Sequence, residues 1–281
     1  CPQPQCAQDT VIHICPNCHG EVPAKPWRSP SLTLSIVGST GAGKSVYLTV
    51  AMNDLTTNLP AILGAESGVS IASGTTRSKI QANEDLLITK GQALQTTQSK
   101  ILNPDVRLPF LFNLSSWQYR CGLRPLKKKL NTFLSIYDAA GEDFNDQSDT
   151  HTMKQIPMAD GLIMFIDPLS LPGFAQSIGQ EPAGQHPSQI LDMLYNAYVL
   201  QQRGKLHMGD KIGVPTAFIL GKADLYGPWI EDKPNIMNAV EHKGGVDVKA
   251  LERSSTATEA VLNQLGGNTL IDVIKNRFEN F

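Results

Sequence analysis

The stretch that most constrains this chain is Gly38–Ser45, which reads GSTGAGKS and matches the pattern G-x-x-x-x-G-K-[ST]. Alternating apolar residues precede it, as in a strand, and a helical pattern follows it. An incidental glycine turn is the alternative, but the spacing and the flanks favour a phosphate loop. The loop N–H groups and the start of the helix would surround a polyphosphate, with Lys44 as a movable positive charge and the Ser45 hydroxyl on Mg²⁺. The sequence therefore predicts a nucleoside triphosphate site.

The overall composition is that of an ordinary globular chain. Of the 281 residues, 41% are hydrophobic, and the formal net charge of −2 lacks the basic excess typical of nucleic-acid binding. The longest apolar run, Leu162–Ile166, is far shorter than the roughly 20 residues of a membrane-spanning helix. We therefore expect no membrane segment and a cytoplasmic location, and the overall charge does not indicate a nucleic-acid partner, although the local basic patch of Arg124 and Lys127–Lys129 leaves one open. Because the sequence begins at Cys1 rather than Met, we also expect it to be either a processed product or a part of a longer chain.

Four of the five cysteines lie within the first 18 residues, in the forms C-P-x-x-x-C and C-P-N-C-H. Paired knuckles of this kind bring four thiolates to one tetrahedral Zn²⁺, which supplies folding energy that so short a segment lacks. We predict a zinc ribbon over residues 1–22, with His13 and His19 as substitute ligands. Disulfide pairing is the alternative, which a cytosolic nucleotide-binding protein would not normally keep. The predicted zinc ligands are Cys1, Cys6, Cys15 and Cys18.

After a proline-rich linker over residues 23–30, the domain of residues 31–281 alternates apolar strands with amphipathic helices. This alternation, with a phosphate loop after the first strand, predicts an α/β fold of three layers with a mostly parallel sheet and its ligand at the carboxyl ends of the strands. Residues 61–99, with a weak helical pattern over 76–87, are interpreted as an insertion or a mobile switch segment. The expected strands are 106–115, 131–137, 159–167 and 214–220, the expected helices are 44–59, 188–203, 256–265 and 269–278, and residues 169–187 are expected to form a loop.

The strand over 131–137 ends in the run Asp138–Glu142, which reads DAAGE. An aspartate at the carboxyl end of an apolar strand can hold Mg²⁺ through water, and the Gly141 N–H could approach a γ-phosphate. Asp and Gly are also common turn residues, which is the alternative interpretation. Because this run follows a phosphate loop in the chain, we favour the nucleotide-binding interpretation.

Four motifs in order, GSTGAGKS, DAAGE, ADGLIMFID and GKAD, together resemble the series of the translation-factor-related (TRAFAC) P-loop GTPases, which have a Ras-like fold. With the predicted zinc ribbon, the chain is similar to bacterial double-GTPase proteins of conflict and signalling systems. The resemblance implies GTP or GDP with Mg²⁺ as cofactors and a set of site residues. The implied nucleotide-binding residues are Gly38, Ser39, Thr40, Gly41, Ala42, Gly43, Lys44, Ser45, Val46, Lys222 and Asp224, the Mg²⁺ residues are Ser45, Thr97 and Asp138, and the catalytic residues are Lys44, Thr97, Gly141 and Glu142.

Three departures from the family pattern qualify this resemblance. Gly221 replaces the usual Asn of N-K-x-D, and Glu142 stands where many relatives have Gln. A carboxylate near a γ-phosphate is repelled, so slow hydrolysis is expected. The family also has a threonine in switch I, the segment ahead of the second strand, and Thr96 is the alternative to Thr97 for that residue. No S-A-K-like stretch follows the last helix, and a final strand would be expected to begin at Phe281, so the resemblance predicts a chain truncated before that strand.

The sequence therefore predicts a GTP-dependent switch with slow, Mg²⁺-dependent hydrolysis, which contacts a protein partner through its switch regions or its zinc ribbon. Two alternatives remain open at this point. One is a nucleotide-stabilised zinc-ribbon scaffold with little turnover, which Glu142 motivates. The other is an ATP-using P-loop NTPase, which Gly221 motivates.

Overall fold

A computed structural model of the chain describes residues 13–14, 21–22, 29–63, 67–92, 94, 108–120, 126–138, 156–201, 207–237 and 246–281. The centre of the fold is a six-stranded sheet in the order β4-β5-β6-β3-β7-β8. The pairs β6–β3, β3–β7 and β7–β8 are parallel, and the pairs β4–β5 and β5–β6 are antiparallel. The expected mixed α/β fold with a mostly parallel sheet is confirmed. The strands of this sheet are β3 (Ser31–Gly38), β4 (Gly68–Ile71), β5 (Phe110–Arg120), β6 (Leu126–Asp138), β7 (Gly161–Ile166) and β8 (Thr216–Leu220).

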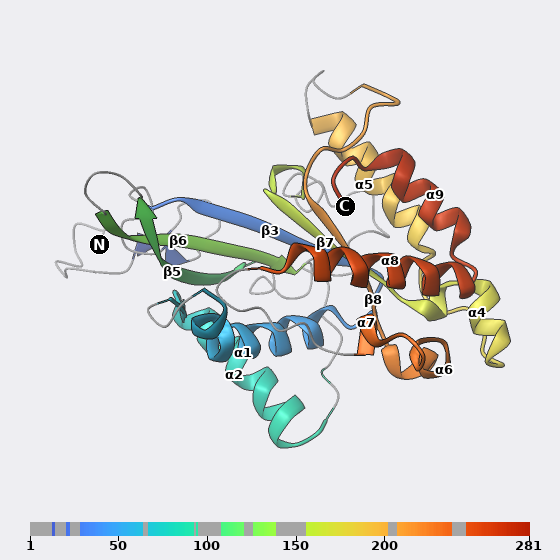
Figure 1. Cartoon of the computed structure of the whole chain (residues 1–281), viewed down its shortest axis with the longest axis horizontal. Coiled ribbons are helices and arrows are strands. Elements are labelled where there is room, and N and C mark those ends of the chain that lie inside the picture. The colour runs from blue at the N-terminus through green and yellow to red at the C-terminus, as the bar shows by residue number, and fades with distance from the viewer. Residues whose placement is uncertain are drawn as a thin grey trace, which may run out of the picture.

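Helices cover both faces of this sheet (Figure 1). Because side chains alternate along a strand, Ile36 packs into one apolar core and its neighbour Val37 into the other. Helices α1 and α2 bury their apolar residues in the first core, and α5, α8 and α9 bury theirs in the second. The helices are α1 (Lys44–Leu63), α2 (Gly74–Glu84), α4 (Pro172–Ser177), α5 (Pro187–Gln201), α6 (Gly227–Ile230), α7 (Pro234–Met237), α8 (Val248–Gln264) and α9 (Asn268–Arg277). None of the described helices is long and apolar enough to cross a membrane.

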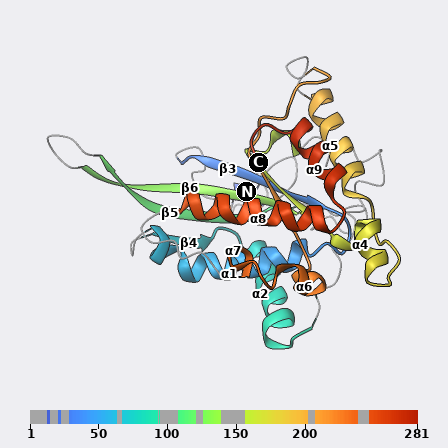
Figure 2. The same ribbon diagram turned by 45° about the vertical axis from the view of Figure 1, so that its right-hand side comes forward.

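The strands β5 and β6 form a ribbon that reaches away from the helices (Figure 2). They pair from Phe110↔Ile136 to Arg120↔Leu126, whereas β6 pairs with β3 only from Phe133 onward. The expected strands 106–115 and 131–137 imply a long connection, which is wrong because β5 extends to Arg120 and β6 begins at Leu126. The run Lys127–Lys129 interrupts the apolar pattern of β6, so the sequence did not indicate a strand there.

The stretch expected as an insertion or mobile segment contributes regular structure to the domain. Its strand β4 pairs antiparallel with β5 at the edge of the sheet, and α2 continues into a π-helical turn, Asp85–Thr89. The Ser73 side chain caps α2 by accepting from the Thr76 N–H at 3.1 Å. A strand of four residues is too short to show a clear hydrophobic period. Its pairing with β5, which lies about 40 residues further along the chain, is also not visible in the local sequence.

Several helix boundaries also differ from the predictions. Helix α1 continues past Pro60 to Leu63, because a proline in the last turn removes a single hydrogen bond, at the carbonyl of Thr56. Helix α8 begins at Val248, eight residues before its predicted start, since the Asp247 carboxylate accepts from the Ala250 N–H at 3.0 Å and caps it. The expected loop over 169–187 contains α4, preceded by a 3₁₀ turn, Pro168–Ser170.

The last residues of the sequence lie along the outer edge of β8. Phe278 bridges Ile212 in parallel, and the Thr216 N–H donates to the Asn280 carbonyl at 2.9 Å. The rings of Phe278 and Phe281 both approach Phe218 edge to face. These contacts anchor the end of α9 against the sheet.

Candidate functional site

The glycine-rich segment forms an open loop between β3 and α1, at the carboxyl edge of the sheet. Gly41 and Gly43 have φ values of +76° and +96°, a conformation that favours glycine, and a Cβ on either would meet nothing within 4 Å. Gly38, with φ +148°, is required for space, because its Cβ would lie 2.8 Å from the Phe165 carbonyl oxygen on β7. The loop is therefore held tightly by the sheet below and is open above, where a phosphate chain could lie.

Lys44 starts helix α1 with its ammonium group folded back onto this loop. Its Nζ donates to the carbonyls of Gly38 at 2.8 Å and Ser39 at 2.9 Å, and the residue is only 6% exposed. Val46, in the first helical turn, is exposed. The helix start, the open loop and a fixed buried cation together form an environment suited to an anion.

Ser45 and Asp138, the two Mg²⁺ residues that lie in the described chain, are in direct contact. The Ser45 hydroxyl donates to Asp138 Oδ2 at 3.1 Å. The contact follows from the register, since Ile36 of β3 pairs with Asp138 at the end of β6. Hydroxyl and carboxylate oxygens are ligands that Mg²⁺ prefers, so the oxygen atoms of Ser45 and Asp138 fit this cation. In the described part of the chain, no group of three or more His, Cys, Asp or Glu side chains could hold a metal ion.

The GKAD motif follows β8 and lies directly against the phosphate loop. A Cβ on Gly221 would sit 2.7 Å from the carbonyl oxygen of Ala42. No side chain fits between the two loops at this position, which accounts for the glycine there. Asp224, in the 3₁₀ turn Ala223–Tyr226, is exposed at the same edge of the sheet.

Lys222 connects this loop to β7 through an ion pair that the sequence did not predict. Its Nζ lies 2.7 Å from Oδ2 of Asp167, a side chain that is only 4% exposed. Asp167 follows the buried strand β7 directly, and its Oδ1 accepts from the Leu169 N–H at 3.0 Å. Its position after a strand that neighbours both loops was the available signal, but the pairing itself spans 55 residues.

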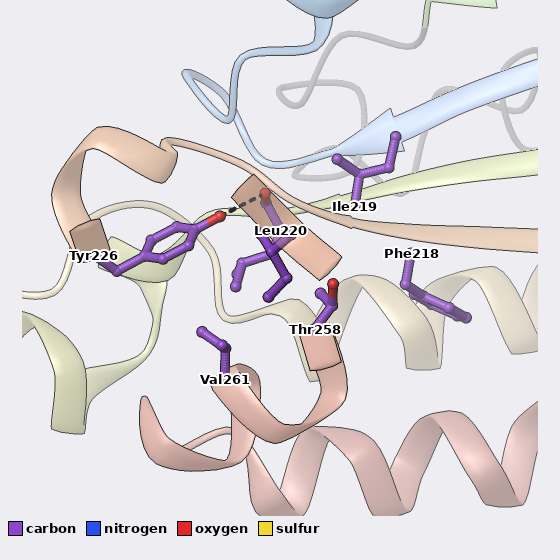
Figure 3. A pocket seen from close by; sticks show the side chains of 7 residues that line it. Phe218, Ile219, Leu220, Tyr226, Thr258 and Val261 are labelled. Carbon is purple, nitrogen blue, oxygen red and sulfur yellow. Dashed lines mark hydrogen bonds between the residues drawn. The ribbon is translucent and has the colours of Figure 1, made fainter. Parts of the chain in front are cut away.

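The turn that carries Asp224 borders a small, mostly apolar pocket, which Tyr226 helps to line (Figure 3). The Tyr226 hydroxyl donates to the Leu220 carbonyl at 3.0 Å and fastens the turn to β8. The cavity has a volume of about 210 Å³. Residues of β8, the turn, α7 and α8 line it, namely Phe218, Ile219, Leu220, Tyr226, Ile236, Thr258 and Val261.

Burial, and then the negative charge of Asp224, raise the pKa of Tyr226 to about 12 from the usual 10.0. Between pH 10 and 12 the unfolded chain has lost the Tyr226 proton and the folded protein still holds it. The contribution of Tyr226 to the free energy of unfolding is therefore fully present below pH 10 and is lost as the pH rises from 10 to 12. We expect the free energy of unfolding to fall by about 1 kcal/mol per pH unit more steeply in wild type than in Tyr226→Phe. Urea unfolding between pH 9 and 11.5 measures this difference, and equal slopes would contradict it.

A segment without a predicted role also touches the phosphate loop. Gly184, in the connection before α5, packs so that a Cβ there would lie 3.6 Å from the Cβ of Ser39. Ser39 is consequently buried, whereas the adjacent Thr40 is exposed. The phosphate loop is thus bordered by β7 on one side and by this connection on another.

Other predicted site residues lie outside the described part of the chain. They include Thr97 and its alternative Thr96, Gly141 and Glu142, and the cysteines Cys1, Cys6, Cys15 and Cys18. Within the predicted ribbon, the strands β1 (His13–Ile14) and β2 (Glu21–Val22) pair antiparallel. The catalytic and zinc assignments therefore remain predictions.

The mostly parallel sheet, the glycine-rich loop and the buried lysine at a helix start are consistent with a P-loop NTPase fold. No protein-family model and no curated protein matches the chain. The Ski7 GTPase-like domain of S. cerevisiae, solved with GDP and inorganic phosphate, is similar at a TM-score of 0.32 and 16% identity, over 84% of this chain. The match covers 40% of the Ski7 chain. A TM-score of this size carries no functional argument, so the class rests on the strand order and the loop geometry.

Proposed function

We propose that the protein is a guanine-nucleotide-binding switch that hydrolyses GTP slowly with Mg²⁺. The observation that carries the proposal is the juxtaposition at one edge of the sheet. The open loop with Lys44 follows β3, Asp138 ends the neighbouring strand β6, and Asp224 follows β8 on the other side. A nucleotide lying across this edge would meet the cation and the N–H groups with its phosphates and Asp224 with its base.

In this proposal the described site residues bind different parts of the nucleotide and its cation. The N–H groups of the loop and the Lys44 ammonium bind the phosphates and stabilise charge that develops on the β–γ bridge oxygen. The Ser45 hydroxyl and Asp138 would hold Mg²⁺, which when bound neutralises phosphate charge. The Asp224 carboxylate accepts from guanine N1–H and N2–H₂, which adenine does not offer.

The slow rate is the part of the proposal that rests on sequence. Glu142 would face the γ-phosphate where many relatives have Gln, and two negative groups repel unless one is protonated. Loss of the γ-phosphate would release Thr97 and Gly141, and with them the switch segments. We further propose membership of the double-GTPase group of bacterial conflict and signalling systems, with a zinc ribbon and a protein partner.

Exchange of Asp224 for asparagine tests the assignment of guanine. Wild type should bind GTP in preference to ATP and xanthosine triphosphate. In Asp224→Asn, the affinity for GTP should fall at least about 10-fold and that for xanthosine triphosphate should rise, because an amide can donate to the xanthine 2-oxo group. Competition against a fluorescent GTP analogue measures both affinities.

Asp232→Asn provides a matched control, since it makes the same chemical change at a side chain that is 81% exposed. ATP competing as well as GTP in wild type would contradict guanine recognition. Single-turnover hydrolysis then separates a switch from a scaffold. If the protein binds GTP tightly but hydrolyses it no faster than GTP hydrolyses in solution, and if no activating partner is missing from the assay, the result would favour the scaffold.

A further inference from the structure

We propose that Asp167 is a positioning residue for base recognition, acting by holding Lys222 and the turn that carries Asp224. The inference rests on the proposed guanine-nucleotide function and adds a residue for which the sequence predicted no role. It depends on three features of the described residues, namely the close packing at Gly221, the backbone of Lys222 and the burial of Asp167.

The first feature is the direct packing of the loop Gly221–Asp224, called the base loop because it would meet the base, on the phosphate loop. Because the Gly221 Cβ position lies 2.7 Å from the backbone oxygen of Ala42, a side chain at 221 cannot connect the two loops. The Gly221 N–H donates to the Ile166 carbonyl at 3.0 Å. The base loop is therefore fastened to the end of β7, next to Asp167, rather than through a side chain of its own.

The second feature is the backbone of Lys222. With φ +54° and ψ +50°, it is the one non-glycine residue with positive φ in the described part of the chain. A lysine has no intrinsic preference for this left-handed region, so tertiary contacts must hold it there. The ion pair between Lys222 Nζ and Asp167 Oδ2, at 2.7 Å, is such a contact.

The third feature is that Asp167 is itself fixed. It leaves the central strand β7, its side chain is 4% exposed, and its second oxygen accepts from the Leu169 N–H at 3.0 Å. Lys222 is 29% exposed and would otherwise be free to move. The rigid partner of the pair thus sets the position of the flexible one.

The consequence reaches Asp224 through the backbone. Lys222 immediately precedes the 3₁₀ turn Ala223–Tyr226, and its carbonyl accepts from the Leu225 N–H at 3.0 Å. The left-handed conformation of Lys222 therefore sets the direction in which the chain leaves β8 and the place where Asp224 meets the base. Holding Lys222 also keeps its aliphatic stem where it can cover the face of the base.

The test compares Asp167→Asn, Lys222→Met and the double variant. Asparagine retains an acceptor for the Leu169 N–H, but it loses the charge and places its NH₂ group at the position where Oδ2 accepts from Lys222. We expect Asp167→Asn to lower the affinity for GTP about 10-fold and to reduce the preference for GTP over inosine triphosphate, which lacks the 2-amino group. The double variant should bind GTP no more weakly than Lys222→Met alone, because Asp167 acts through Lys222.

Asp160→Asn is the matched control, because Asp160 precedes β7 at the opposite edge of the sheet, where its Oδ2 accepts from the Thr33 N–H at 2.8 Å. It should leave the GTP-to-inosine preference unchanged. Unchanged GTP affinity and preference in Asp167→Asn, or a loss that adds fully to that of Lys222→Met, would overturn the inference alone. A wild type that binds no GTP would overturn the proposed function and this inference with it.

Discussion

Replacing Lys44 with methionine is expected to weaken GTP binding by at least about 100-fold while leaving the fold intact. The Lys44 ammonium is the buried cation of the loop, held by the carbonyls of Gly38 and Ser39. Methionine preserves most of the side-chain volume but removes the charge that phosphate oxygens would meet. Since a buried charge also costs desolvation energy, its removal should change the stability of the nucleotide-free protein much less than the affinity.

Titration calorimetry with GTP and Mg²⁺ measures this loss, and thermal unfolding without nucleotide checks the fold. Lys275→Met provides the control, because Lys275 is half exposed and pairs with Glu259 on α8. GTP affinity in Lys44→Met within threefold of wild type would exclude this loop as the phosphate site.

The second large effect is expected from Gly221→Asn, which introduces the residue that N-K-x-D usually has. By family analogy the change should strengthen the base loop. The packing predicts the opposite, because a Cβ 2.7 Å from the backbone oxygen of Ala42 must push the two loops apart. We expect a loss of about 3 kcal/mol in the free energy of unfolding, with weaker GTP binding.

Gly221→Ala should show most of the same loss, because the clash lies at Cβ and not at the amide. Gly227→Ala is the control, since its Cβ would meet nothing within 4 Å. Urea unfolding and GTP titration of the three variants check the prediction. A Gly221→Asn variant that is as stable as wild type and binds GTP more tightly would show that the loops are not packed in this way.

The sequence by itself determined the features that are encoded in neighbouring residues. The phosphate loop is set by its own glycines and lysine, and α5 and α9 follow from apolar residues repeated at helical spacing. The buried strand β7 was recognisable as an apolar run with no polar alternation. The α/β class followed from the order of these elements along the chain.

The tertiary structure alone decided what depends on residues far apart in sequence. The edge strand β4 is formed by pairing with β5, and the pairing of β5 with β6 continues through the lysine-rich start of β6. Asp167 meets Lys222 only because β7 and β8 lie side by side. Gly221 looked like the loss of a recognition residue, but it is the residue that the packing on Ala42 allows. A local pattern records the spacing of residues along one segment, whereas these contacts depend on which segments the sheet brings together, and that depends on the fold as a whole.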